Sequence, residues 1–245
     1  LSVANLAVIP PAVLAMATKG AVNFHDGPLP RHAGLNAPVW AILAGEVRHG
    51  ITWHLIEGGV DEGDILEQRL FDIAPNETAL TLNTRCFEAG MESFPALVDQ
   101  LETGLRRVKQ DLTLRSLHQR HDRPAAMGRI DFSKPAEEVV RLVRALDHGR
   151  YWNPLTTAKI ATASRVLNVG AADLAAALAS GLAAGLSFGL APALAQTPAP
   201  TPAPSGAVLK LIVGYAAGGP VDMAARVFAP VLGRELGQNV IVENR

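Results

Sequence analysis

Three polar residues near the start of the chain have the types and spacing that acyl transfer requires. Asn23 and His25 stand two positions apart in the run GAVNFH, and Asp61 follows Asn23 by 38 positions (61 − 23 = 38). A histidine can act as general acid and base near neutral pH, and an asparagine amide can donate to a developing oxyanion. An aspartate can orient the histidine and favour its protonated form. If the attacking group is a substrate amine, the protein needs no nucleophile, so the residues predict direct acyl transfer.

A strand must hold the first two of these residues. The run GAVNFH predicts a strand, whose period of two places Asn23 and His25 on one face and Phe24 on the other. The turn-rich residues 26–30 follow at once, so the pair lies near the carboxyl end of the strand. Open α/β sheets collect their ligands at that edge.

A second strand and an acidic loop must return the aspartate. Residues 51–56 predict the strand, and residues 58–64, with the sequence GGVDEGD, form a tight loop after it. The glycines give this loop the freedom to turn back. We expect the side-chain polar atoms of Asn23, His25 and Asp61 to lie about 3 to 6 Å apart in one pocket. Taken singly, each residue fits a strand end or a turn, and the flanking sequences favour a joint site.

The segments around these residues resemble the catalytic half of folate-dependent formyltransferases. NFHDGPLPRHAG at 23–34, HGITWH at 49–54 and VDEGDIL at 60–66 match that family in order and spacing. The first segment is most similar to formyltransferase domains of nonribosomal peptide synthetase-like enzymes, and methionyl-tRNA and glycinamide-ribonucleotide formyltransferases share the pattern more loosely. The resemblance implies transfer of a formyl group from the co-substrate 10-formyltetrahydrofolate to an amine, for which an aminoacyl group is one candidate.

The resemblance also implies roles for individual residues. His25 would shuttle protons, Asn23 would hold the formyl oxygen, and Asp61 would support His25 and a bound water. Thr52 would support the acidic loop with its hydroxyl, as part of the folate site. The other folate-binding residues would act largely through their backbone: Leu6, Ala7, Ile9, Ile56, Glu57 and Gly58. A plain core strand explains the side chains of residues 6–9 equally well.

The order of predicted elements indicates an α/β fold. The resemblance implies a partial doubly wound, Rossmann-like sheet that lacks its first strands, and a chain that begins with Leu1 instead of Met is expected to be a fragment. Periodicity and turn residues predict a strand at 1–9, helices at 12–17, 36–46 and 77–104, strands at 49–57 and 64–73, and a helix that starts near residue 135. One stripe of the long helix is expected to face the core: Leu80, Phe87, Met91, Phe94, Val98 and Leu101.

No metal site is expected. His49 and His54 lie on one predicted strand at positions that differ by an odd number, so they face opposite ways and cannot share a metal. One or both are therefore interpreted as structural. His118 and His121 have a spacing that metal sites use, but the stretch RSLHQRHDRP around them is basic, turn-prone and without cysteine.

A change of composition after residue 160, together with what the family resemblances imply, divides the chain into four regions. We expect a formyltransferase catalytic segment at 1–110, the start of the formyltransferase C-terminal region at 111–160, a signal-like apolar helix and Pro-rich linker at 161–207, and a separate β-α-β unit at 208–245. Residues 170–196 are rich in Ala, Leu and Gly and end in an Ala-x-Ala pattern typical of secretory signal peptides. A weak transmembrane helix and an apolar tail that packs or aggregates are the alternatives.

The last region resembles the first β-α-β unit of tripartite tricarboxylate receptors, which are periplasmic solute-binding proteins. The resemblance rests on Gly218, Gly219, Asp222 and the final VENR. One such unit cannot form a two-lobed cleft, so ligand binding is not carried over. A secreted carboxylate-binding receptor fragment and an inactive gene fusion are the alternatives to the transferase, and a join between two genes is the favoured explanation of the whole chain.

Composition also limits which classes of partner and which cellular compartment we expect. Of the 245 residues 49% are hydrophobic, and the formal net charge of −1 gives no reason to expect nucleic acid or an anionic membrane as a partner. Membrane contact is expected only through residues 170–196. The single cysteine, Cys86, excludes an internal disulfide and suits a reducing cytoplasm. The signal-like segment would direct only the C-terminal part to the periplasm.

Overall fold

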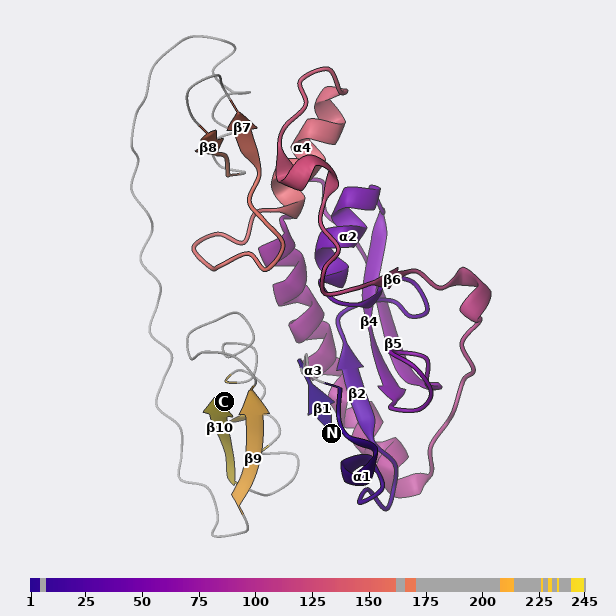
Figure 1. Ribbon diagram of the computed structural model, residues 1–245. Coiled ribbons are helices and arrows are strands. Elements are labelled where there is room, and N and C mark those ends of the chain that lie inside the picture. The colour runs from indigo at the N-terminus through magenta and orange to yellow at the C-terminus, as the bar shows by residue number, and fades with distance from the viewer. Residues whose placement is uncertain are drawn as a thin grey trace.

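The computed structural model describes residues 1–4, 8–161, 166–170, 208–213, 226, 229–230, 233 and 239–244 (Figure 1). Two short 3₁₀ turns, Leu112–Leu114 and Ala125–Gly128, lie between the larger elements. In chain order the elements are β1 (Ser2–Val3), α1 (Pro11–Leu14), β2 (Val22–His25), β3 (Ala33–Gly34), α2 (Ala37–Ala44), β4 (Arg48–Leu55), β5 (Ile65–Asp72), α3 (Ala79–Thr103), β6 (Leu117–His118), α4 (Ala136–Ala145), β7 (Lys159–Ala161), β8 (Val166–Asn168), β9 (Val208–Val213) and β10 (Asn239–Asn244).

The main sheet has four strands in the order β1-β2-β4-β5. β1 is parallel to β2, whereas β2 with β4 and β4 with β5 are antiparallel. The predicted α/β class is confirmed and the described sheet is mixed, while the doubly wound arrangement stays a prediction. The short loop between β4 and β5 accounts for their antiparallel pairing, because a parallel pair needs a crossover of about a dozen residues or more.

Helix α3 covers one face of the sheet and is well capped. The side chain of Thr78 accepts from the backbone N–H of Thr81, whose hydroxyl accepts from the N–H of Thr78, and Gly104 ends the helix with a φ of 126°. The predicted core stripe is largely confirmed, because Phe94 is fully buried and Phe87, Met91, Val98 and Leu101 pack half-buried against the same core. The helix also buries smaller residues that the stripe did not include, such as Cys86, Gly90 and Ser93.

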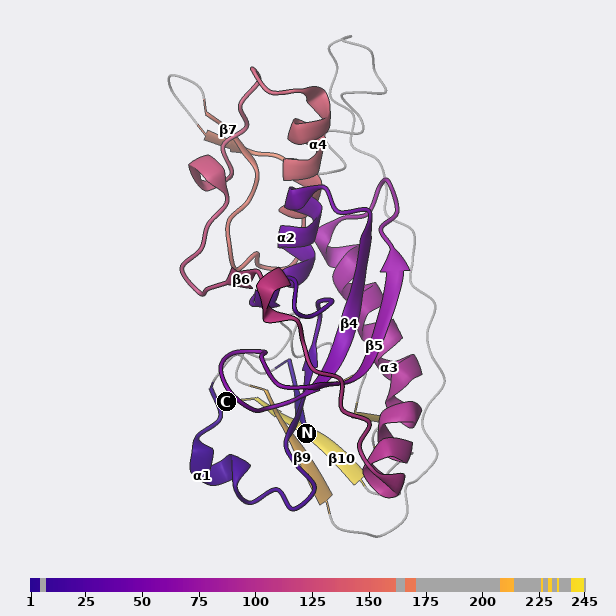
Figure 2. The same ribbon diagram turned by 90° about the vertical axis from the view of Figure 1, so that its right-hand side faces the viewer.

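Two clusters of buried side chains hold these layers together. The first lies between the sheet and α3 and includes Ile51, Trp53 and Leu97, each fully buried. The second joins α2, the start of α3 and α4 through residues such as Ile42 and Val143. After α3 the chain returns on the side of the sheet away from that helix and reaches β6 beside α2 (Figure 2).

The C-terminal strands form a separate pair. β9 and β10 are parallel, as a β-α-β unit requires, and Leu211 and Val240 pack against the first core cluster (Figure 1). The signal-like segment 170–196 and the Pro-rich linker lie outside the described residues, so the interpretations of that region stay predictions. No helix in the described part of the chain is both long and apolar enough to cross a membrane.

Candidate active site

The pairing of β2 with β4 builds one wall of the site. The antiparallel register places Asn23 opposite His54 and His25 opposite Thr52. Residues that are directly opposite in a sheet share a face, so these four side chains point to the same side. The predicted shared face of Asn23 and His25 is therefore observed, and the register adds two residues from the neighbouring strand.

The loop after β4 returns Asp61 to this wall. Asp61 itself has a positive φ of 55°, and Gly63 approaches the carbonyl oxygen of Leu55 so closely that an added Cβ would lie 1.9 Å from it. Oδ2 of Asp61 lies 3.6 Å from Nδ1 of His25, within the expected range, and Oδ1 lies 3.3 Å from Nε2 of His54. The structure thus brings the predicted carboxylate and histidine together.

The surroundings of Asp61 keep it ionised. Burial by itself would raise the pKa of this carboxyl, because a charged group is disfavoured away from water. The hydrogen bond with His54, the charge of His25 and the N–H of Gly34, which donates to Oδ2 over 2.8 Å, outweigh burial and lower the pKa to about 2. Asp61 is therefore an anion at any pH near neutrality.

The two ring nitrogens of His25 have different partners. Nε2 lies 2.9 Å from the carbonyl oxygen of His32, and because a carbonyl only accepts, Nε2 carries the hydrogen. Nδ1 faces carboxylates instead, at 3.6 Å from Asp61 and 3.9 Å from Asp26. Burial raises the pKa of Asp26, and the charge of His25 acts against that rise. Nδ1 is thus the nitrogen that can take and return a proton beside a fixed negative charge.

His54 belongs to the site, although the sequence did not assign it a role there. Its Nδ1 lies 2.8 Å from the carbonyl oxygen of Leu55 and therefore carries a hydrogen. Its Nε2 lies between the amide nitrogen of Asn23, at 3.2 Å, and Asp61. His49 does face the other way, as predicted, and its Nε2 donates to the carbonyl oxygen of Asp26 over 2.9 Å. The signal that could have found His54 is its cross-strand register with Asn23.

The residues expected at a folate site divide into three groups. Leu6 and Ala7 lie outside the described residues. Ile9 and Ile56 are half-buried, and the exposed Glu57 and Gly58 lie at the start of the acidic loop, where the Glu57 carboxylate pairs with Arg107 over 2.6 Å.

Thr52, which was expected to support the acidic loop at the folate site, is buried with 0% of its surface exposed. Its hydroxyl donates to the carbonyl oxygen of Gly27 over 2.8 Å and accepts from the N–H of Leu29 over 3.1 Å. It also accepts from Nε2 of Gln68 over 3.0 Å, so its one hydrogen and both lone pairs are used. In this structure Thr52 fixes the turn that follows His25, and its folate-site role stays a prediction.

A distant segment fixes the acidic loop instead. Nε2 of Gln110 donates to the carbonyl oxygens of Asp61, at 2.9 Å, and of Gly63, at 2.7 Å. Arg107 pairs with Asp64 over 2.8 Å, and the Arg115 guanidinium donates to a loop carbonyl. Sequence reasoning missed these residues, because contacts across more than 40 positions leave no local pattern.

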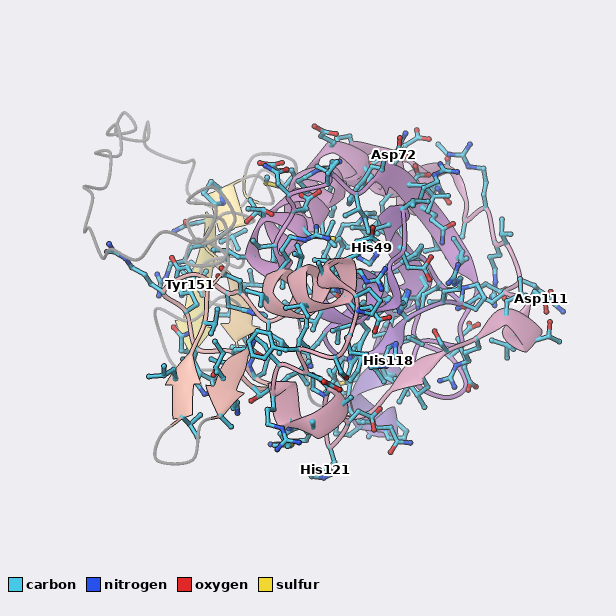
Figure 3. The ribbon with its side chains drawn as sticks, turned by 90° about the horizontal axis from the view of Figure 1, so that it is seen from above. His49, Asp72, Asp111, His118, His121 and Tyr151 are labelled. Atoms are coloured by element: carbon cyan, nitrogen blue, oxygen red, sulfur yellow. The ribbon has the colours of Figure 1, made fainter. Side chains whose placement is uncertain are left out.

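The remaining histidines form no metal site. In the described ranges no three His, Cys, Asp or Glu residues have an arrangement that could hold a metal ion. His118 and His49 lie inside the molecule, whereas His121 lies at its rim (Figure 3). His118 and His121 therefore lie in different parts of the molecule.

Comparison with known proteins supports the similarity found in the sequence. Residues 2–98 match the family described as "Formyl transferase". The chain is 35% identical over 143 residues to the methionyl-tRNA formyltransferase of Solibacter usitatus. This match covers 57% of this chain and 44% of that protein. The resemblance to formyltransferases is confirmed for this part of the chain, while the receptor resemblance of residues 208–245 stays a prediction.

Two solved structures share the fold. A 4-N formyltransferase from Francisella tularensis has a TM-score of 0.60 and 21% identity, with 69% of this chain and 68% of that one covered. The methionyl-tRNA formyltransferase from Clostridium thermocellum has a TM-score of 0.52 and 24% identity, with 66% of each chain covered. The chain spans less than half the length of the curated relatives it matches.

Proposed function

We propose that residues 1–110 are the catalytic segment of a transferase that moves a formyl group from 10-formyltetrahydrofolate to an amine. The observation that carries this proposal is the convergence of Asn23, His25 and Asp61 on one wall, within a segment that matches formyl transferases. Residues 111–160, which contribute β6 and α4, would begin the C-terminal region of the same enzyme.

In the proposed reaction His25 moves the proton. Nδ1 accepts the proton of the attacking amine as nitrogen forms its bond to the formyl carbon, and then returns it to the departing nitrogen of the folate. Asp61, whose pKa is about 2, stays ionised throughout and stabilises the imidazolium that forms 3.6 Å away. Because the attacking and leaving groups are both nitrogens of the substrates, no covalent enzyme intermediate is needed.

Asn23 is assigned to the developing oxyanion. Its amide N–H₂ is half-buried on the same face as His25, where a hydrogen bond to an anionic oxygen is stronger than in water. His54 Nε2 lies 3.2 Å from this amide nitrogen. The amide hydrogens of Asn23 are assigned to the formyl oxygen.

The proposed folate site lies beside the exposed start of the acidic loop, at Glu57 and Gly58, and includes the half-buried Ile9 and Ile56. Leu6 and Ala7 complete this proposal from the family resemblance alone. The proposed roles use no metal ion. The amine is proposed to be an aminoacyl group, as in methionyl-tRNA, the substrate named for the Solibacter usitatus protein.

The test is release of tetrahydrofolate from 10-formyltetrahydrofolate, measured by absorbance, with methionyl-tRNA, free amino acids and amino sugars offered separately. We expect release that depends on one of these amines. His25→Ala should lower kcat by about 10²- to 10⁴-fold, the usual range for loss of a general acid–base. The proposal fails if no amine stimulates release, or if His25→Ala turns over as fast as the wild-type chain.

A further inference from the structure

The turn between β2 and α2 touches both members of the proposed catalytic pair. The carbonyl oxygen of His32 accepts from Nε2 of His25 over 2.9 Å, and the N–H of Gly34 donates to Oδ2 of Asp61 over 2.8 Å. Backbone groups two residues apart thus fix the histidine and the carboxylate relative to each other. A small change in this turn would change the distance between Nδ1 of His25 and its carboxylate.

The turn has a backbone conformation that needs outside support. His32 has a φ of 56° and Gly34 a φ of 92°, both in the left-handed region. A residue with a side chain seldom occupies this region unless neighbouring groups hold it there. Gly34 is also required by packing, because an added Cβ would lie 2.1 Å from the carbonyl oxygen of His118.

The support comes from residues 116–118, which lie beyond the part of the chain that matches the formyl transferase family. The hydroxyl of Ser116 accepts from the N–H of His32 over 2.8 Å, and its carbonyl oxygen accepts from the N–H of Ala33 over 2.8 Å. The carbonyl oxygen of His118 accepts from the N–H of Leu35 over 2.9 Å. These bonds belong to the short parallel pair of β3 and β6.

The side chain of His118 holds His32 from the other side. Its Nε2 lies 3.1 Å from Nδ1 of His32, and its ring stacks between those of His32 and Trp40, at centroid distances of 5.4 and 4.7 Å. Burial lowers the pKa values of His32 and His118 to about 4, so both rings are neutral near pH 7. One neutral ring can donate to the other, and neither places a positive charge beside His25.

We propose that Ser116 and His118 are positioning residues, which set the geometry of His25 and Asp61 through the turn at residues 32–34. The proposal rests on the proposed function for its kinetic consequence. Its structural part, the placement of the His25 ring, holds whether or not the chain transfers a formyl group. Neither residue touches the reacting atoms.

Two variants test the proposal in the full chain. Ser116→Ala removes the hydroxyl that holds His32, and His118→Phe removes the ring hydrogen bond but keeps an aromatic ring for stacking. We expect each to lower kcat by about tenfold with little change in KM, because a misplaced catalytic group costs turnover. Ser116→Thr should restore the rate. The matched controls are Ser133→Ala, which removes an exposed hydroxyl bonded to Asp131, and His121→Phe, and both should keep wild-type kinetics.

The second measurement is the ¹⁵N spectrum and the pH titration of the His25 ring. Ser116→Ala and His118→Phe should change the ¹⁵N resonances of the His25 ring and its titration curve. Ser133→Ala and His121→Phe should leave both unchanged. If the wild-type chain has no transferase activity, the proposed function fails while this spectrum still tests the positioning. The positioning proposal is overturned if the His25 resonances and titration are the same in Ser116→Ala, His118→Phe and the wild-type chain.

Discussion

Two groups of buried histidines lie within one small region and differ in what surrounds them. The site histidines, His25 and His54, both lie within 3.6 Å of the carboxylate of Asp61. The backing histidines, His32, His49 and His118, contact carbonyl oxygens and one another's rings. The carboxylate nearest to His32, that of Glu46, is already paired with the guanidinium of Arg31.

The difference shows how neighbours decide what a histidine can do. Burial lowers the pKa values of the backing histidines to about 3 for His49 and about 4 for His32 and His118. In the described residues Nδ1 of His49 is buried without a hydrogen-bond partner, so a proton there would be an unpaired buried charge. The backing histidines are neutral near pH 7, and the proposed proton transfer is assigned to the face that Asp61 reaches.

The largest expected effect comes from removing the negative charge of Asp61, which distinguishes the site histidines from the backing histidines. Asp61→Asn keeps the size of the side chain but removes the anion that stabilises a charged His25. We expect kcat to fall by about 10³-fold, within the range for loss of acid–base function. Steady-state kinetics measure the loss, and a thermal melt checks folding.

A matched substitution on β5 serves as the control. Asp72 is 87% exposed and its carboxylate pairs with the exposed Arg48, so Asp72→Asn should keep the wild-type kcat. Equal rates for Asp61→Asn and Asp72→Asn would show that the carboxylate of Asp61 has no part in turnover. The contrast between site and backing histidines would then lose its basis.

The second prediction concerns the backing histidines and the stability of the fold. His49 binds a proton at pH 6.5 in the unfolded chain but only at about pH 3 in the folded chain. Its contribution to the free energy of unfolding is therefore complete above pH 6.5 and is lost as the pH falls toward 3. His49→Gln can keep a hydrogen bond to Asp26 without titrating. The unfolding free energy of the variant should therefore vary less between pH 3 and pH 6.5 than that of the wild-type chain, by up to about 5 kcal/mol.

Urea unfolding at several pH values from 3 to 7 measures this slope. His121→Gln is the control, because His121 is exposed and its replacement should leave the slope as it is in the wild-type chain. An unchanged slope in His49→Gln would mean that His49 takes up its proton at the same pH in the folded and the unfolded chain. His49 would then not be a neutral backing histidine.

Much of the site could be predicted because its signals are local. The alternation of Asn23, Phe24 and His25 within one strand fixed their faces, and the glycines around Asp61 predicted the return of that residue. Both depend only on neighbours in the chain. His54 was missed because its role depends on cross-strand register, and Ser116 and Gln110 were missed because they reach the site from 49 to 84 positions away.

The errors in the fold have the same origin. Periodicity in α3 identified most of the apolar stripe that packs on the core, but it did not identify the small buried residues Cys86 and Ser93. Close packing also selects small side chains, and hydrophobicity alone does not show where. Thr52 was placed correctly on its strand, yet only the structure shows that its hydroxyl is used by the turn at residues 27–29.

The smallest expected effect separates His54 from the backing histidines. Nε2 of His54 lies 3.3 Å from Asp61, so His54→Gln removes a hydrogen bond that lowers the pKa of Asp61. We expect kcat to fall by about tenfold and the pKa of Asp61 to rise, because one of its several partners is lost. Carboxyl ¹³C titration of Asp61 measures the second effect independently of turnover. If His54→Gln changes neither quantity, as expected for His121→Gln, then His54 is a structural residue like His49. In that case His25 is the one site histidine that remains, because proximity to Asp61 alone does not make a histidine part of the site.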